Sequence, residues 1–204
     1  MNTKFDFYLA SQSLRRQELL TQVGISFDVL DVNIDESVKE HESAQDYVIR
    51  LAKEKALAGW SLVNQETSAV LGSDTSVVIN GQILGKPENS EDAKRMLGLL
   101  SGNTHQVMTA VALVAPAPNN IQSEQYELTS VLKVSDVTFK VLSDSEIEQY
   151  VEFGECDDKA GSYAIQGLAA AFITHLSGSY SGVMGLPLFE TVQLLNNAGI
   201  STDS

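Results

Sequence analysis

Basic side chains suited to binding phosphate recur where helices, turns and strands are expected to begin or end. They are Arg15, Arg16, Lys55, Lys86 and Lys159. Arginine offers a planar fork of donors that matches phosphate oxygens, and lysine supplies a compact positive charge. For Arg15 and Arg16 taken alone, the alternative interpretation is an ordinary capped helix with solvated side chains.

Two serines accompany this arginine pair. Ser11 and Ser13 lie where a predicted strand at residues 5–10 gives way to a predicted helix at residues 11–23. A strand-to-helix turn offers unpaired backbone N–H groups at the positive end of the helix dipole, and the serine hydroxyls add further donors. Together with the arginines they make a candidate phosphate-binding turn.

Two carboxylates are candidates for acid–base or metal chemistry. Asp74 follows a buried strand predicted at residues 69–72, so we expect it just beyond the strand end, where open α/β sheets bind ligands. There it would act as a general base or metal ligand; the alternative is a turn or cap residue. Glu36 is a second candidate metal ligand, in an acidic loop where solvation is the alternative interpretation.

Carboxylates are also the expected ligands of any metal in this chain. The three histidines, His41, His105 and His175, have no paired spacing, and Cys156 is the single cysteine. Oxygen ligands favour a divalent cation such as Mg²⁺ or Mn²⁺. Cys156 lacks a nearby histidine and has acidic neighbours, so it is a poor candidate nucleophile.

Residues 158–167 combine charge, glycine and an amide in a pattern unlike that of a plain strand, and they indicate a binding loop. Gln166 carries both a donor and an acceptor and could read the edge of a nucleobase, whereas a hydrogen-bonded buried amide is the alternative. Two familiar motifs are excluded. Residues 81–87 lack one spacer and the Ser/Thr of a P-loop, and residues 178–182 have Tyr where a nucleophile elbow needs Ser.

Alternating strands and helices must position these groups. Strands are expected at residues 5–10, 27–32, 69–72, 77–84, 104–114 and 132–141, and helices at 11–23, 47–57, 90–100, 143–154 and 187–199. Asn80-Gly81 predicts a tight hairpin, Ser90 is the expected cap of its helix, and the polar segment 115–129 is expected to be a solvated insertion. Hairpins within an alternating pattern predict an α/β fold with a mixed sheet.

Size, charge and cysteine content limit the classes of function. A chain of 204 residues suits one domain or two closely packed lobes, and its formal net charge of −14 opposes binding to nucleic acid or to an anionic membrane. A single cysteine fits a reducing compartment, and no apolar run is long enough to span a bilayer. We therefore expect a cytoplasmic protein that binds a small anion.

Five sequence blocks stand in a fixed order along nearly the whole chain. They are residues 9–16 (LASQSLRR), 73–75 (SDT), 85–87 (GKP), 158–167 (DKAGSYAIQG) and 178–187 (GSYSGVMGLP). Together these blocks resemble the Maf family of nucleoside triphosphate pyrophosphatases, and five ordered blocks are far more specific than any one of them.

The resemblance implies a fold, a reaction and a quaternary state. The fold is an elongated α/β domain over residues 1–204, with a mixed sheet flanked by helices and two lobes around a central cleft. The reaction is hydrolysis of a nucleotide to its monophosphate and pyrophosphate with a divalent cation, Mg²⁺ or Mn²⁺. Family members are often dimeric, so a homodimer is an expectation too.

The resemblance also assigns roles to individual residues. Asp74 corresponds to the proton-accepting aspartate of the family, and the phosphate-contacting basic residues correspond to Arg16, Lys55 and Lys86. Residues with the identities of Arg15, Thr75 and Gln166 resemble the branch that hydrolyses dTTP and UTP. The branch that cleaves 7-methylguanosine triphosphate typically has Trp, Gln and Glu at these three places.

Some positions depart from the family pattern, and two other functions are alternatives. Ala169-Ala170-Ala171 replaces a stretch commonly rich in glycine, Cys156 stands where Pro is frequent, and the segment 115–129 is longer than usual. These departures concern the loops and not the reaction. The alternatives are a non-hydrolytic nucleotide-binding regulator of cell division, against which Asp74 weighs, and a pyrophosphatase for another modified nucleotide.

Overall fold

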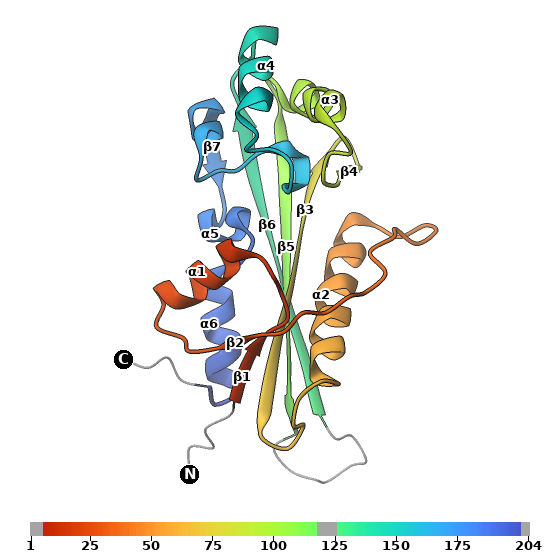
Figure 1. The fold of residues 1–204 in the computed structure, drawn as a ribbon, viewed down its shortest axis with the longest axis vertical. Helices are drawn as coiled ribbons and strands as arrows, with labels where there is room; N and C mark the ends of the chain where they lie inside the picture. The colour runs from red at the N-terminus through yellow and green to blue at the C-terminus, as the bar shows by residue number, and fades with distance from the viewer. Residues whose placement is uncertain (1–5, 118–125, 201–204) are drawn as a thin grey trace. The chain divides into compact units, whose positions relative to one another are not determined.

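A computed structural model of the protein describes residues 6–117 and 126–200 (Figure 1). In this part of the chain, seven strands form one mixed sheet in the order β2-β1-β3-β5-β6-β7, with β4 paired to β3. Helices flank the sheet, so the predicted α/β class is confirmed. The elements are β1 (Asp6–Leu9), α1 (Leu14–Gln22), β2 (Asp28–Val29), α2 (Ala44–Trp60), β3 (Ser68–Ile79), β4 (Gln82–Leu84), α3 (Ser90–Leu100), β5 (Thr104–Pro116), β6 (Tyr126–Phe139), α4 (Asp144–Phe153), η1 (Ala160–Ser162), η2 (Leu168–Phe172), β7 (Ile173–Ser177), α5 (Tyr180–Met184) and α6 (Leu188–Asn197).

The chain divides into two compact units. Unit 1 contains Met1–Asp74, Thr109–Lys133 and Gly185–Ser204, and unit 2 contains Thr75–Met108 and Val134–Met184. The chain passes from one unit to the other within β3, β5 and β6, and again directly after α5. A single domain with a cleft between two lobes, which the resemblance implies, stays a prediction.

Unit 1 is organised by parallel strand pairing. β1 pairs in parallel with both β2 and β3, so that Leu9 lies opposite Val29 on one side and Leu71 on the other. Parallel neighbours require crossover connections, which α1 and α2 supply between successive strands. In Figure 1, α1 and α6 lie on one side of these strands and α2 lies on the other.

Two glycines allow α2 to lie directly against β3. A Cβ atom at Gly72 of the strand would overlap the backbone oxygen of Ala52 and stand 2.6 Å from the backbone nitrogen of Ala56. A Cβ atom at Gly59 of the helix would stand 2.8 Å from a methyl carbon of Val70. The helix backbone therefore contacts the strand where no side chain intervenes, and this approach places Lys55 beside the residues that follow Gly72.

Unit 2 contains the predicted hairpin and its own core. Asn80 and Gly81 have φ values of 51° and 78°, the left-handed conformation that a tight hairpin turn requires, and they join β3 to the antiparallel strand β4. α3 packs against α4, and Leu97, Phe139 and Tyr150 are among the buried residues of this core.

The predicted bounds of α3, α4 and α6 agree with the observed ones to within two residues, whereas α1 begins three residues later than predicted and α2 extends three residues further at each end. The Ser43 hydroxyl accepts a hydrogen bond from the Asp46 N–H at the start of α2, which is one of the two hydrogen bonds of a capping box. Ser143 and Glu146 form a full capping box on α4, which ends before Gly154 with a φ of 80°. α6 begins directly after Pro187, as expected.

Several boundaries differ from the predictions. α3 is capped by Asn89 and not by Ser90, because the Asn89 side chain accepts from the Asp92 N–H. β2 covers only two of the six predicted residues, and β7 was not predicted because its alternation is weak. The insertion predicted at 115–129 is partly wrong, since β5 runs to Pro116 and β6 begins at Tyr126; residues 118–125 lie outside the described part of the chain.

Over the described residues, no helix combines the length and apolar character needed to cross a bilayer. This finding agrees with the absence of a long apolar run in the sequence.

The close approach at Gly72 predicts a large effect of a single methyl group. Gly72→Ala should lower the free energy of unfolding by about 3 kcal/mol, because the new Cβ meets helix backbone that cannot rotate away. Urea unfolding measures the change. Gly98→Ala in α3 is the matched control, since nothing lies within 4 Å of its Cβ position; it should be neutral or stabilising. Equal effects of the two variants would contradict the packing described.

Candidate active site

Asp74 lies inside a strand rather than beyond one. β3 continues without a break from Ser68 to Ile79, so the strand end predicted at Gly72 is wrong. Gly72 marks instead the point where α2 approaches, and the serine and threonine residues that flank Asp74 are compatible with an extended backbone. A charged side chain thus sits in the middle of a buried strand.

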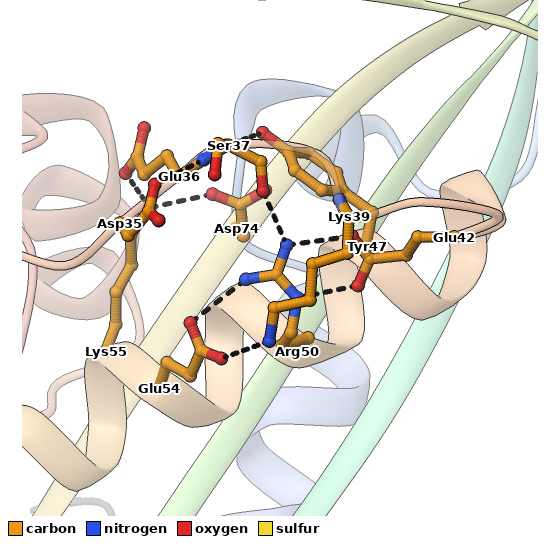
Figure 2. A network of polar contacts seen from close by, with 10 residues as sticks. All are labelled: Asp35, Glu36, Ser37, Lys39, Glu42, Tyr47, Arg50, Glu54, Lys55 and Asp74. Atoms are coloured by element: carbon orange, nitrogen blue, oxygen red, sulfur yellow. Dashed lines mark hydrogen bonds and ion pairs between the residues drawn. The ribbon is translucent and has the colours of Figure 1, made fainter.

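Lys55 connects Asp74 to Glu36. The Lys55 Nζ lies 2.7 Å from Asp74 Oδ1 and 2.7 Å from Glu36 Oε1 (Figure 2). The side chains of Lys55 and Asp74 are only 13% and 10% exposed, whereas Glu36 is 51% exposed. The two carboxylates predicted as metal ligands therefore converge on one ammonium group. One of them, Asp74, is buried, and the other, Glu36, is exposed.

Burial controls the electrostatics of this group. Loss of solvent raises the pKa of the Asp74 carboxyl above its ordinary value, while the charges of Lys55 and Arg16 oppose the rise and that of Glu36 adds to it. Burial also lowers the pKa of Arg16, against which Asp74 acts. A carboxylate with a raised pKa is a stronger proton acceptor than an exposed one, which suits a general base.

Arg16 is anchored by groups distant from it in sequence. Its Nε donates to the carbonyl oxygen of Gly185 at 2.9 Å, and its Nη1 donates to the hydroxyl of Ser11 at 3.0 Å. The Ser73 hydroxyl donates to the same Gly185 oxygen at 3.0 Å. Ser73 and Arg16 thus donate to the same carbonyl oxygen, that of Gly185. Neither Ser73 nor Gly185 was predicted as a site residue, because nothing in the local sequence shows this contact.

The remaining residues of the predicted phosphate-binding turn surround Arg16. Ser13 is the N-cap of α1, but its side chain makes no capping hydrogen bond, and its N–H donates to the Ser11 hydroxyl at 3.3 Å. Arg15 is half-buried in the first turn of α1. The predicted position of both arginines in that first turn is confirmed, and their phosphate-binding role stays a prediction.

The loop that carries Glu36 is fastened to α2. Arg50 makes two hydrogen bonds to the Glu42 carboxylate, at 2.6 and 2.8 Å, and donates to the Ser37 carbonyl oxygen at 3.0 Å (Figure 2). The Tyr47 hydroxyl donates to the Glu36 carbonyl oxygen at 2.9 Å. Arg50 lowers the pKa of Glu42 to about 2, so the pair stays charged at neutral pH. Arg50 and Tyr47 were not predicted, and only the fold reveals their contacts with the loop.

Three predicted site residues belong to unit 2. Thr75 follows Asp74 in β3, Lys86 is exposed beyond β4, and Gln166 is exposed on a turn. The Gly161 N–H donates to the Gly85 carbonyl oxygen at 3.0 Å, which joins the residue before Lys86 to the predicted binding loop. Because Gln166 is exposed, the alternative of a buried, hydrogen-bonded amide is wrong.

The donor set fits a hard divalent cation bound together with a ligand. In the portion of the chain that the structure describes, no group of three or more His, Cys, Asp or Glu side chains is arranged to hold a metal. Mg²⁺ nevertheless commonly takes one or two protein carboxylates and completes its shell with water and substrate phosphates. Asp74 and Glu36, which already converge on a single cationic atom, match that requirement.

Cys156 does not take part in this chemistry. It is buried and has no disulfide partner, and burial raises the pKa of its thiol. Both features disfavour the thiolate that a nucleophile needs. The sequence-based exclusion of Cys156 as a nucleophile is consistent with these properties.

Comparisons with known proteins agree with the residues gathered here. A family model described as Maf-like protein matches residues 6–198. The chain belongs to the Maf family. It is 52% identical over 195 residues to a protein of Pseudoalteromonas atlantica named dTTP/UTP pyrophosphatase, which covers 95% of this chain and 97% of that relative.

Two further Maf relatives carry the same name. A protein of Vibrio parahaemolyticus is 52% identical over 195 residues, covering 96% of this chain and 98% of its own length. A protein of Shigella sonnei is 50% identical over 190 residues, covering 93% and 91% respectively. The resemblance inferred from five sequence blocks is therefore confirmed at the level of the family.

Arg50 should control the order of the loop that carries Glu36. Arg50→Gln removes the paired hydrogen bonds to Glu42 and the bond to Ser37, so backbone amides of residues 35–43 should exchange with solvent several-fold faster. Hydrogen exchange followed by mass spectrometry measures this. Arg95→Gln, which removes an arginine paired with Asp92 in α3, is the control and should leave these amides unchanged. Unaltered protection in the Arg50 variant would show that the loop is held by other contacts.

Proposed function

We propose that this Maf protein is a nucleoside triphosphate pyrophosphatase that hydrolyses dTTP and UTP to the monophosphate and pyrophosphate. The observation that carries the proposal is the buried Asp74 carboxylate, held by Lys55 and close enough to Arg16 for their charges to interact. A protein that only bound nucleotide would gain from the cations but would be weakened by a buried anion beside them. The names of the relatives at 50–52% identity support the same reaction.

The cations bind the phosphate chain. Arg16 offers a guanidinium already oriented by Ser11 and Gly185, and Lys55 offers an ammonium on the rigid helix α2. Preorganised cations stabilise the charge that develops on phosphate oxygens during transfer, because they need little rearrangement at the moment of reaction. Ser11, Ser13 and the exposed Lys86 add donors to the nucleotide phosphates in this proposal.

Asp74 activates the water. The water oxygen forms a bond to the α-phosphorus while a water proton passes to the Asp74 carboxylate, and the bond from the α-phosphorus to the bridging oxygen breaks. That oxygen departs with the β- and γ-phosphates as pyrophosphate, which accepts a proton from solvent according to pH. Lys55 holds the carboxylate in place before reaction, so the base does not have to be ordered by the substrate.

Asp74 and Glu36 would hold the divalent cation, Mg²⁺ or Mn²⁺, that the family resemblance implies. When bound, such an ion neutralises phosphate charge and polarises the phosphoryl oxygens. The role of Lys55 is then to keep the two carboxylates convergent while no cation is present, because the like charges would otherwise repel each other. Glu36 is more exposed than Asp74, so an incoming ion would reach Glu36 first.

Residue types in unit 2 and on α1 favour a pyrimidine. The Gln166 amide both donates and accepts, which matches the donor and acceptors on the edge of uracil or thymine, whereas a Glu could only accept. Thr75 adds a small hydroxyl, and Arg15 donates hydrogen bonds but is itself cationic, so it cannot attract a cationic methylated purine as the ring of Trp does. A pyrophosphatase for another modified nucleotide is the second candidate, since the same groups accept modified pyrimidines.

The setting of the reaction follows from the same features. We place the protein in the cytoplasm, because Cys156 is a free thiol and the substrates are intracellular nucleotides. The net charge of −14 makes a nucleic-acid partner unfavourable. The family resemblance also suggests a homodimer.

The first test of the mechanism is Asp74→Asn. This variant keeps the shape of the side chain and removes both the base and a charged ligand, so kcat should fall by about 10²- to 10⁴-fold. The fold should survive, because Lys55 keeps its ion pair with Glu36 at 2.7 Å and the amide oxygen of Asn can still accept a hydrogen bond from it. Glu190→Gln is the matched control, since Glu190 is another ion-paired carboxylate of unit 1, 2.8 Å from Lys133. Near-normal turnover by a folded Asp74→Asn protein would exclude the role of Asp74.

Metal dependence is the second test. Removal of divalent ions by EDTA should abolish turnover, and Mg²⁺ or Mn²⁺ should restore it, because the available ligands are carboxylates rather than soft donors. Calorimetric titration of Mn²⁺ into wild type and Glu36→Gln measures binding without turnover, and the variant should bind more weakly. Full activity in metal-free buffer would contradict the proposed cofactor.

Substrate choice is tested with a panel of nucleotides. Release of pyrophosphate from dTTP, UTP, CTP and 7-methylguanosine triphosphate gives kcat/KM for each. The values for dTTP and UTP should exceed that for CTP by at least about tenfold, because the CTP amino group leaves a polar group that the bound base covers without a hydrogen-bond partner. If CTP or the methylated purine ranked first, the base assignment would fail while the reaction stood. If none were cleaved, the non-hydrolytic regulator would be favoured.

A further inference from the structure

Gln166 stands on a turn whose two preceding residues, Ala164 and Ile165, are buried. The Gly167 N–H donates to the Ala164 carbonyl oxygen at 3.1 Å, which closes a turn of four residues with Gln166 in its third position. Ala164 and Ile165 are only 6% and 5% exposed, whereas Gln166 is exposed. One polar side chain thus projects from a turn that is otherwise packed into unit 2.

Tyr150 of α4 holds the first end of this turn. Its hydroxyl accepts a hydrogen bond from the Ala164 N–H at 3.2 Å and donates to Glu155 Oε2 at 2.8 Å. Burial raises the pKa of the Tyr150 phenol, and the bond to Glu155 adds to the rise, so the hydroxyl keeps its proton at neutral pH. The Tyr150 ring packs edge-on against Phe172, with centroids 5.3 Å apart, which fixes the hydroxyl in place.

Glu155 holds the other end. Its Oε1 accepts from the Leu168 N–H at 3.2 Å, two residues beyond Gln166. A Cβ atom at Gly167 would overlap the Glu155 carboxylate, so the carboxylate lies flat against the Gly167 backbone. The absence of a side chain at position 167 is therefore a condition for this contact.

These contacts form a continuous clamp that runs from the Ala164 N–H through the Tyr150 hydroxyl and the Glu155 carboxylate to the Leu168 N–H. We propose that Tyr150 and Glu155 are positioning residues for nucleobase selectivity, which fix the turn so that the Gln166 side chain approaches the base from one position. This inference rests on the proposed role of Gln166 in reading a pyrimidine. Neither clamp residue needs to touch the nucleotide.

Selectivity depends on such rigidity. A glutamine amide that is free to turn over can offer its oxygen or its NH₂ group to the same position, so it accepts the CTP amino group as readily as the UTP carbonyl. A turn fixed at both ends holds the Gln166 backbone in one place, so fewer arrangements of its amide reach the base and the wrong base is left with unpaired groups. Ordering the turn in advance also avoids an entropy cost on binding, so the effect appears in KM.

Tyr150→Phe is the sharpest variant, because it keeps the ring packing and removes both hydroxyl contacts. We expect its ratio of kcat/KM for UTP over CTP to fall by at least about fivefold, through a higher KM for UTP with little change in kcat. Glu155→Ala should act in the same way, and Glu155→Gln should recover part of the ratio, since its oxygen can still accept from Leu168.

Glu146→Gln is the matched control. Glu146 belongs to the capping box of the same helix, α4, and pairs with Lys140, but it does not contact the turn. This variant should lower stability and leave the UTP-to-CTP ratio unchanged, because a smaller folded fraction reduces both rates equally. Hydrogen exchange at residues 164–168 is the second readout, and it should quicken in Tyr150→Phe but not in Glu146→Gln.

The outcomes separate the inference from the proposed function. Wild-type selectivity in both Tyr150→Phe and Glu155→Ala would overturn the inference, whether or not exchange at residues 164–168 changes. If wild type cleaved neither dTTP nor UTP, the proposed substrate would fail, and the ratio between the nucleotides it does cleave would decide on the clamp. If it cleaved none, exchange at residues 164–168 would decide alone.

Discussion

The ion pair between Lys55 and Asp74 is the contact around which unit 1 is arranged. A carboxylate in the middle of a buried strand costs several kcal/mol unless a charged partner lies beside it, and Lys55 supplies that partner at 2.7 Å. The partner reaches the strand because Gly72 has no side chain and lets the backbone of α2 approach. One helix therefore provides the counter-ion of Asp74, the docking point of the Glu36 loop and the close contact with the strand.

The same arrangement bears on how a strongly acidic protein would bind a polyphosphate through Arg16 and Lys55, as proposed. The net charge of −14 is distributed over the whole chain, whereas Arg16 and Lys55 are largely buried, where charges interact more strongly than in water. Salt screens exposed charges beyond about 10 Å, so the local cations dominate near the site. Arg16 and Lys55 already form hydrogen bonds to acceptors of the protein. A bound phosphate would replace some of these acceptors, and the two side chains would not have to be ordered first.

Much of the fold follows from local sequence signals. The hairpin at Asn80-Gly81, the capping box on α4 and the residues 14–16 at the start of α1 were predictable, because turn and cap chemistry are set by a few neighbouring residues. The extent of β3 was not, since a glycine and an aspartate disfavour a strand locally and only packing against α2 overrides that preference. Asn89 rather than Ser90 caps α3, because the folded backbone directs the Asn89 side chain toward the Asp92 N–H.

The candidate site was predictable by residue type and less so by contact. Asp74, Lys55 and Glu36 were identified from the sequence, yet their convergence on one ammonium group is visible only in the structure. Other residues support the site through backbone groups or through partners distant in sequence, so residue type and spacing did not identify them. These residues are Arg50, Tyr47, Ser73 and Glu155. Such supporting residues decide how firmly the predicted groups are held.

The proposed reaction is attack by a water molecule on the α-phosphorus. Hydrolysis of UTP by the wild-type enzyme in water enriched in ¹⁸O, followed by mass spectrometry of both products, tests it directly. We expect one ¹⁸O atom in UMP and none in pyrophosphate. Label in pyrophosphate, or release of labelled inorganic phosphate, would place the attack at another phosphorus and contradict it.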